Sequence, residues 1–198
     1  MSFLFDRLAF LYDGFMKKAG LADEVRLLNY LGDVSGKRIA DIGGGTGSLS
    51  AMLADLNAEV ALIEPSVSMS CIALHKDRRI RSVNASAESI PLSDAVFDVV
   101  CLKDCLHHIT DRQKAVAEAV RILRPGGKIV VMEFHPGSFK AKLILLFERL
   151  CLERTRLIHP ETLKKMLYDR GVEGEIFLLN RLEYLYVGCK VGEDSTLL

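Results

Sequence analysis

The stretch that decides the fold is RIADIGGGTG, residues 38–47, where a short apolar strand runs into four glycines. Glycine has no Cβ, so the backbone can turn sharply and its amides can approach a ligand closely, beside the positive end of the next helix. Nicotinamide-binding folds carry the spacing G-x-G-x-x-G. The pattern Asp41-x-Gly43-x-Gly45-x-Gly47 differs from it and suits a ligand that has no pyrophosphate. We therefore predict a pocket for a nucleotide-type cofactor and disfavour a nicotinamide oxidoreductase.

Strand-like apolar runs alternate with helical stretches after this point. The expected strands are 38–42, 59–64, 80–84, 97–102 and 128–134, separated by helical stretches at 48–56, 66–75 and 111–123. Such alternation predicts an α/β fold in which a parallel sheet is wrapped by helices. Two more helical stretches, 139–153 and 160–170, precede two strand-like runs, 175–179 and 182–191, that predict a hairpin. Helical spacing in residues 5–15 and 25–31 predicts two helices before the sheet.

Composition describes an ordinary globular chain of 198 residues, 49% hydrophobic and 26% charged, which we interpret as one domain spanning 1–198. The formal net charge is zero and no basic patch is found, so nucleic acid is not expected as a partner. Residues 1–15 carry neither a basic leader nor a small-residue cleavage site, so a cytoplasmic location is expected. Five irregularly spaced cysteines are expected to be reduced thiols without a disulfide.

Three further features lie at compatible spacing. Glu64 ends the second expected strand, where its carboxylate could accept both hydroxyls of a ribose. The run Phe97-Asp98-Val99-Val100 forms the fourth strand, and LRPGGK, residues 123–128, predicts a turn into the fifth. Together these features are much more specific than any one of them.

With these features the chain resembles the class I S-adenosylmethionine-dependent methyltransferases, from about residue 12 to residue 191. The segments DIGGGTGSLS, AESIP, LHHITD and LRPGGKIVVMEF, at 41–50, 87–91, 106–111 and 123–134, are similar to the ubiquinone/menaquinone-biosynthesis C-methyltransferases (methyltransferase type 11). The resemblance implies a Rossmann-like sheet of seven strands, mostly parallel with a C-terminal antiparallel hairpin and helices on both faces. It also implies an N-terminal helical cap over 1–34 and a helical lid insertion over 138–170.

The same resemblance implies that S-adenosyl-L-methionine is the cofactor. The residues that match the family's cofactor contacts are Tyr12, Asp41, Gly43, Gly45, Thr46, Gly47, Glu64, Ser86, Ala87 and Lys103. Ser86 stands where many relatives carry Asp or Asn, and Lys103 replaces a small polar residue. Asp41 has a second interpretation, in which it orients the amides of the loop without touching the cofactor.

The activated methyl group of a sulfonium needs mainly alignment with a nucleophile and exclusion of water. A ring carbon of a hydroquinone becomes nucleophilic when its hydroxyl loses a proton, so a base with a pKa near neutrality suits that acceptor. His107 and His108, directly after the fourth strand, are the candidate catalytic residues, and capping or packing is their alternative role. Cys101 and Cys105 lie near them, but no further ligand pattern accompanies the group, so no metal site is predicted.

The sequence therefore favours a methyltransferase for a small, largely apolar acceptor, with a quinone-precursor ring carbon first. A phospholipid headgroup, a small amine or hydroxyl metabolite, and a non-catalytic cofactor-binding protein are the alternatives. Residues 139–156 alternate basic and apolar side chains, which predicts either a core-packing helix or a lid or interfacial helix for a lipid-soluble substrate. Exposed apolar helices of this kind are also compatible with a transient membrane-surface contact or a homodimer.

Overall fold

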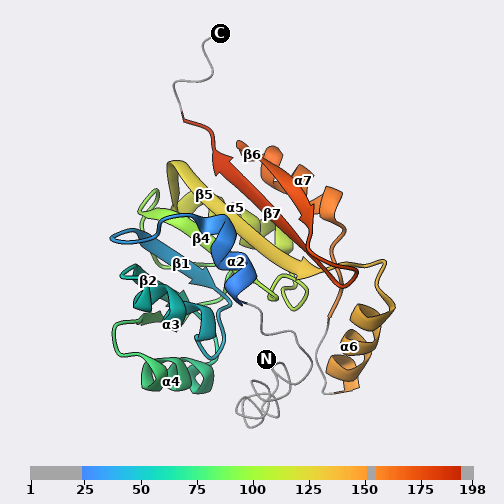
Figure 1. Cartoon of the computed structure of the whole chain (residues 1–198), viewed down its shortest axis with the longest axis horizontal. Helices are drawn as coiled ribbons and strands as arrows, with labels where there is room; N and C mark the ends of the chain where they lie inside the picture. Colours follow the sequence, from blue (N-terminus) through green and yellow to red (C-terminus); the bar gives the residue numbers. More distant parts are fainter. Residues whose placement is uncertain (1–23, 151–154, 193–198) are drawn as a thin grey trace.

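The computed structural model describes residues 24–150 and 155–192, and its centre is a seven-stranded sheet (Figure 1). The strands lie in the order β3-β2-β1-β4-β5-β7-β6. Strands β1 to β5 pair in parallel, whereas β7 pairs antiparallel with both β5 and β6. The predicted mostly parallel sheet with a C-terminal antiparallel hairpin is confirmed.

The strands are β1 (Arg38–Ile42), β2 (Glu59–Ile63), β3 (Arg81–Val83), β4 (Phe97–Lys103), β5 (Leu123–Phe134), β6 (Val172–Leu178) and β7 (Glu183–Lys190). The helices are α2 (Glu24–Leu31), α3 (Ser48–Asp55), α4 (Val67–Lys76), α5 (Arg112–Ile122), α6 (Phe139–Leu150) and α7 (Pro160–Tyr168). Each expected strand and helix from residue 24 onward is present, with boundaries that differ by a few residues. The helix expected over residues 5–15 lies outside the described residues.

The two faces of the sheet are covered by different helices. Alternate residues of β1 illustrate the division, because Ile39 packs with α2 and α3 while Ala40 and Ile42 pack with α5 and α7. Figure 1 shows α2 and α3 in front of the sheet and α5 behind it. Since apolar residues face both ways along the central strands, the sheet is buried on both sides, as parallel sheets are.

The start of β5 corrects one expectation. Residues 123–128 were expected to form a turn, but they are the first part of β5. Phe97 of β4 pairs with Leu123 of β5, and Val99 of β4 pairs with Lys128 of β5. An advance of two residues along β4 therefore corresponds to five residues along β5, and the extra residues of β5 form a bulge. The backbone at Gly126 has a φ of +70°, which permits this local reversal. The Pro-Gly-Gly sequence therefore makes a bulge inside a strand.

The strand order reverses between β1 and β4, because β2 and β3 lie on one side of β1 and β5 lies on the other. In open α/β sheets such a reversal leaves a crevice outside the carboxyl ends of the two strands, where ligands bind. The loops that follow β1 and β4 meet at this edge, and they contain the glycine-rich stretch and Asp104 to Asp111. The fold thus brings the predicted site residues of these two loops to one edge.

Helix α6 follows β5 and lies off the end of the sheet (Figure 1). Ala141 is buried and Ile144 is partly buried against Phe134, so one side of the helix packs on the core. Phe139 and Leu143 are 80% and 57% exposed. The helix is therefore only partly a core-packing element.

Candidate functional site

The glycine loop is held by the residues packed around it. Gly43, Gly45 and Gly47 all have positive φ, between +56° and +73°. A Cβ on Gly47 would lie 2.5 Å from the Cβ of Ala73, whereas a Cβ on Gly45 would have no neighbour nearer than 3.7 Å. Gly47 is thus required for packing of the loop against α4, and Gly45 is required for its backbone conformation alone.

Glu64 follows β2 directly and is 2% exposed. Its carboxylate accepts hydrogen bonds from the backbone N–H of Gly45, at 3.1 Å, and of Ser66, at 2.8 Å. Asn84 donates to the backbone carbonyl of Glu64 at 3.0 Å. These bonds fix the carboxylate beside the glycine loop. A carboxylate has about four acceptor positions, so this geometry is compatible with hydroxyl donors from a ligand.

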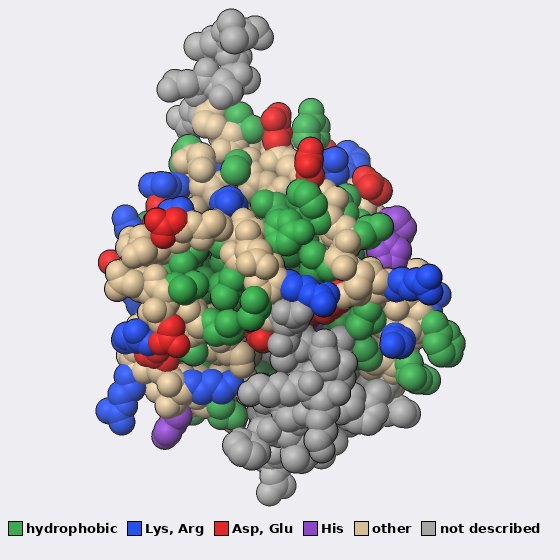
Figure 2. All heavy atoms as spheres, viewed as in Figure 1, with side chains coloured by type: hydrophobic (Ala, Val, Ile, Leu, Met, Phe, Trp, Pro, Cys, Tyr) green, Lys and Arg blue, Asp and Glu red, His purple; other side chains and the backbone are tan. Residues whose placement is uncertain are grey.

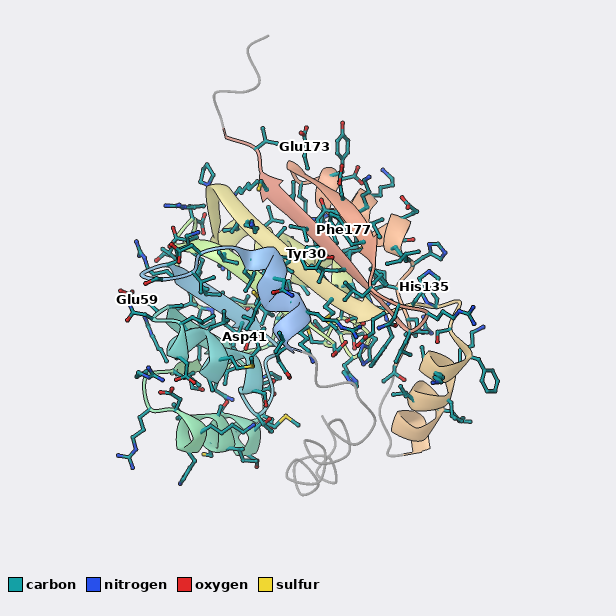
Figure 3. All side chains as sticks on the ribbon, in the orientation of Figure 1. Tyr30, Asp41, Glu59, His135, Glu173 and Phe177 are labelled. Atoms are coloured by element: carbon teal, nitrogen blue, oxygen red, sulfur yellow. The ribbon has the colours of Figure 1, made fainter. Side chains whose placement is uncertain are left out.

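Asp41 lies beneath the loop, completely buried, and Figure 3 shows it under the end of α2. Its Oδ2 accepts a hydrogen bond from Ser50 of α3 at 2.6 Å. A Cβ on Gly44 would lie 2.5 Å from the same Oδ2, so the loop backbone rests directly on this carboxylate. Burial raises the pKa of Asp41 to about 6. This placement favours the interpretation in which Asp41 orients the loop.

Thr46 is also buried in the loop, at 6% exposed. The side-chain amine of Lys76, at the end of α4, donates to Thr46 Oγ1 and to Ser48 Oγ, both at 3.0 Å. The sequence did not single out Lys76, because the contact spans 30 residues and depends on how α3 and α4 pack. The Lys76 cation therefore helps to position the hydroxyl predicted to contact the cofactor.

The predicted pair after β3 lies at the same edge of the sheet. Ala87 is buried in the core, and Ser86 is exposed. The hydroxyl of Ser86 donates to the carboxylate of Glu88 and accepts from the backbone N–H of Glu88 at 3.1 Å. Ser86 thus forms a compact turn with Glu88. The cofactor role of the pair stays a prediction, and Tyr12 lies outside the described residues.

Lys103 and Asp104 stand at the carboxyl end of β4. The Lys103 amine lies 2.8 Å from Asp104 Oδ2 and 3.8 Å from the carboxylate of Glu24 on α2. Burial alone would lower the pKa of Lys103, but the neighbouring Asp104 and Glu24 outweigh it, so the pKa lies above its ordinary value. Asp104 has a φ of +50°, a left-handed conformation uncommon for a residue with a side chain. Lys103 is therefore charged, and it lies at the carboxyl edge of the sheet.

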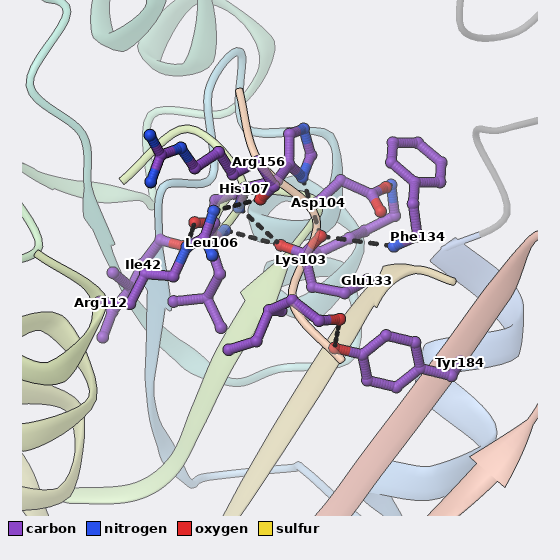
Figure 4. Close-up of polar contacts among 12 residues, drawn as sticks. Ile42, Lys103, Asp104, Leu106, His107, Arg112, Glu133, Phe134, Arg156 and Tyr184 are labelled. Atoms are coloured by element: carbon purple, nitrogen blue, oxygen red, sulfur yellow. Dashed lines mark hydrogen bonds and ion pairs between the residues drawn. The ribbon is translucent and has the colours of Figure 1, made fainter. Parts of the chain in front are cut away.

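His107 is buried against Glu133 of β5. Figure 4 shows Glu133 bridged to Leu106, His107 and Phe134. His107 Nδ1 lies 2.8 Å from Glu133 Oε2, and the backbone N–H of Leu106 donates to Oε1 at 2.6 Å. Burial on its own would raise the pKa of Glu133, but the charge and hydrogen bond of His107 outweigh it, so the pKa lies below its ordinary value. Glu133 thus holds the loop after β4 onto β5.

The two candidate histidines differ in exposure. His107 is 1% exposed, while His108 is partly exposed and its ring centroid lies 4.1 Å from that of His107. The partner of His107 was not recognised from the sequence, because Glu133 reads as part of an apolar strand. Burial on a carboxylate favours a positioning role for His107, and the catalytic role of both histidines stays a prediction.

A cavity region lies at the carboxyl end of β5. Its volume is about 1010 Å³, and it is bordered by α2, by the connection from β5 to α6 and by the turn from β6 to β7. The lining residues include Arg26, His135, Phe139, Leu182 and Glu183. Figure 3 shows His135 at this corner of the sheet, near the start of α6. The predicted lid helix therefore borders a space large enough for a small molecule.

Within residues 24–150 and 155–192, no three His, Cys, Asp or Glu side chains gather as metal ligands would. Burial raises the pKa values of Cys101 and Cys105 well above the ordinary value, so both are held as thiols.

Across the same described ranges, no helix has both the length and the apolar character needed to cross a bilayer.

Comparison with known proteins agrees with this geometry. Residues 40–131 match the family described as "Methyltransferase domain". Over 113 residues the chain is 36% identical to the ubiquinone/menaquinone biosynthesis C-methyltransferase UbiE of Vibrio vulnificus, covering 52% of this chain and 44% of that protein. The chain thus spans about half the length of the curated relatives it matches.

Solved structures show the same fold. A SAM-dependent methyltransferase of Thermotoga maritima superposes with a TM-score of 0.77 at 23% identity, covering 96% of this chain and all of that one. The phosphoethanolamine N-methyltransferase 2 of Haemonchus contortus, in complex with S-adenosyl-L-methionine, gives 0.77 at 18% identity, covering 94% of this chain and 57% of that one. The chain therefore has the Rossmann-like methyltransferase fold. The match to the methyltransferase-domain family covers the central segment, residues 40–131, as the resemblance in the sequence implied.

Proposed function

We propose that this protein transfers a methyl group from S-adenosyl-L-methionine to a small, largely apolar acceptor, with a quinone-precursor ring carbon as first candidate. The single observation that carries the proposal is the Glu64 carboxylate, which the backbone N–H groups of Gly45 and Ser66 fix beside the glycine loop. The matching family and the curated relatives support the reaction class.

The residues at the glycine loop fit an adenosyl cofactor. Glu64 offers carboxylate acceptors for the two ribose hydroxyls, and the space beside Gly45 is open, because a Cβ there would have no neighbour nearer than 3.7 Å. Thr46 and Lys103 would contact the polar end of the cofactor. The cofactor supplies a methyl group on a sulfonium, which is already activated for attack. The protein has to align the acceptor and exclude water.

The acceptor class is inferred from the relatives and from the apolar surroundings. The V. vulnificus relative is named for C-methylation in quinone biosynthesis. In this chain, Phe139 and Leu182 border the cavity beside β5. We propose that the whole chain, 1–198, works as one domain, in which residues 138–170 form a lid over this acceptor.

The cofactor assignment is tested by calorimetric titration with S-adenosyl-L-methionine. Glu64→Gln keeps the shape of the side chain and removes its charge, so affinity should fall by about 1–3 kcal/mol, the range for hydrogen bonds to a charged group. Glu59→Gln is the matched control, because Glu59 is an exposed carboxylate at the opposite end of β2, seen at the periphery in Figure 3. Equal affinity in the two variants, or tighter binding of NAD by the unaltered protein, would contradict the proposal.

A further inference from the structure

Two buried carboxylates at the carboxyl edge have acceptor oxygens that the fold does not use. Asp104, directly after β4, is 9% exposed, and Glu183, the first residue of β7, is 2% exposed. Asp104 Oδ1 and Glu183 Oε1 are both buried and have no hydrogen-bond partner among the residues that the structure describes. An unsatisfied buried acceptor costs about 1–3 kcal/mol, so two at one edge require an explanation.

The backbone at Asp104 is held in a costly conformation. Its φ of +50° is left-handed, and its N–H donates to the Met132 carbonyl at 2.9 Å, which fixes the residue against β5. Strained backbone of this kind clusters at functional sites, where the surrounding structure enforces it.

The charges around the two carboxylates come from α2, β4 and β7. Asp104 Oδ2 is occupied by Lys103, which also faces Glu24. Asn180 donates to Glu183 Oε2 at 2.8 Å. The charges of Lys103 and Arg26 also act on Glu183.

The two carboxylates also act on each other. Burial raises the pKa of Glu183, and the neighbouring charge of Asp104 raises it further. Glu183 also borders the cavity of about 1010 Å³ that reaches α6. Glu183 therefore borders the space beside the helix that we propose as a lid, and Asp104 directly follows the predicted cofactor residue Lys103.

We propose that Asp104 and Glu183 are acceptor-binding residues that take a hydrogen bond from a hydroxyl of the acceptor and receive its proton. This inference rests on the proposed function and replaces His107 in the role of base, since His107 is buried on Glu133. In the step, the O–H bond of the acceptor breaks, its electron pair stays on the oxygen and is shared with the ring, and the proton passes to the carboxylate pair. A ring carbon made electron-rich in this way is the nucleophile that methylation needs.

The test uses 1-naphthol, a redox-stable aromatic hydroxyl, titrated calorimetrically into the full chain saturated with S-adenosylhomocysteine. Asp104→Asn and Glu183→Gln should each weaken 1-naphthol binding at least tenfold. The methyl ether, 1-methoxynaphthalene, should bind all three proteins alike because it has no proton to donate. Asparagine tolerates left-handed φ, so the first variant keeps its backbone. Asp98→Asn, at the amino end of β4, is the matched control and should bind 1-naphthol as the unaltered protein does.

Several results would overturn the inference. The first is that neither variant changes the affinity for 1-naphthol, and the second is that 1-naphthol does not bind at all. The third is that 1-naphthylmethylammonium binds more tightly than 1-naphthol and that the same variants abolish its binding, which would assign the carboxylates to an amine. Melting curves identify a variant that fails to fold, and the 1-naphthol affinity of the other variant then decides whether the inference stands. Failure of S-adenosylhomocysteine itself to bind would overturn the proposed function, whereas loss of the naphthol effect alone overturns only this inference.

Discussion

The carboxyl edge of the sheet has two halves, one at β1 and β2 and the other at β4 and β7, and they differ in how their buried carboxylate oxygens are hydrogen-bonded. At β1 and β2, Glu64 is fixed by backbone N–H groups from the glycine loop and from the start of α4. At β4 and β7, Asp104 and Glu183 each bury an oxygen for which the described part of the chain supplies no donor. The first half is thus organised by the chain itself. The second half has polar groups left over, as expected where the ligand completes the site.

The largest expected effect tests the contact between His107 and Glu133 in the second half of the edge. His107→Ala should lower the free energy of unfolding by about 3–5 kcal/mol, because it leaves the buried charge of Glu133 uncompensated. His108→Ala, at the partly exposed neighbour, should cost less than about 1 kcal/mol. Urea denaturation of the two variants measures the difference. Equal, small losses would mean that Glu133 does not depend on His107 and would restore His107 as a candidate base.

The next prediction tests how tightly the chain organises the first half. Gly47→Ala combines left-handed backbone, at about 1–2 kcal/mol, with overpacking against Ala73, at about 1–3 kcal/mol. Gly45→Ala carries only the backbone cost of about 1–2 kcal/mol, because the added methyl group has room. Chemical denaturation should therefore rank Gly47→Ala as the more destabilised. The reverse order would show that packing against α4 does not define the loop.

Asp41 is the exception in the first half, because its buried Oδ1 also finds no donor within the residues described. Its pKa is raised from 3.8 unfolded to about 6 in the fold, so the protein loses stability as pH rises through that range. Asp41→Asn should remove this pH dependence and raise the free energy of unfolding at pH 7 by at most about 3 kcal/mol. Thermal melts between pH 4 and pH 7 measure both effects. A variant whose stability falls with pH as steeply as the unaltered protein would refute the assignment to Asp41.

The smallest expected effect concerns Lys76. Because Lys76 is exposed, Lys76→Met should lower the free energy of unfolding by only about 0.5 kcal/mol. It should still change cofactor affinity, since it removes the hydrogen bond that Lys76 donates to Thr46. Ser48→Ala, which removes the other hydroxyl bound by Lys76, is the control. Identical cofactor affinity in Lys76→Met and the unaltered protein would show that Thr46 is positioned without the lysine.

Much of the first half could be predicted from the sequence because its determinants are local. The strand, the glycines and Ser66 lie close to Asp41 or Glu64 along the chain, so spacing alone indicates the turn and the carboxylate after β2. The parallel sheet followed for the same reason, since each strand and helix has its own periodicity. Among the elements that the structure describes, the start of β5 was expected to be a turn and is a bulge inside the strand.

The second half depends on contacts between distant strands. Glu183 meets the end of β4 only because β7 pairs with β5, and Glu133 meets His107 across 26 residues. No spacing rule joins these residues, and the carboxylates stand in runs that otherwise read as apolar strands. The positive φ of Asp104 was not predicted either, and the hydrogen bond that its N–H donates to Met132 of β5 is again a contact between strands. Topology therefore decides which carboxylates share the edge.

The position of β7 has a consequence for folding while the chain is being synthesised. Strand β7 is the last described element, yet it lies inside the sheet between β5 and β6. Until the ribosome has released it, β5 has an open edge whose backbone groups can pair with another chain. Premature termination before Glu183 would leave that edge bare and remove the acidic residue that borders the cavity. A nonsense codon there should yield aggregates, not a weakened protein.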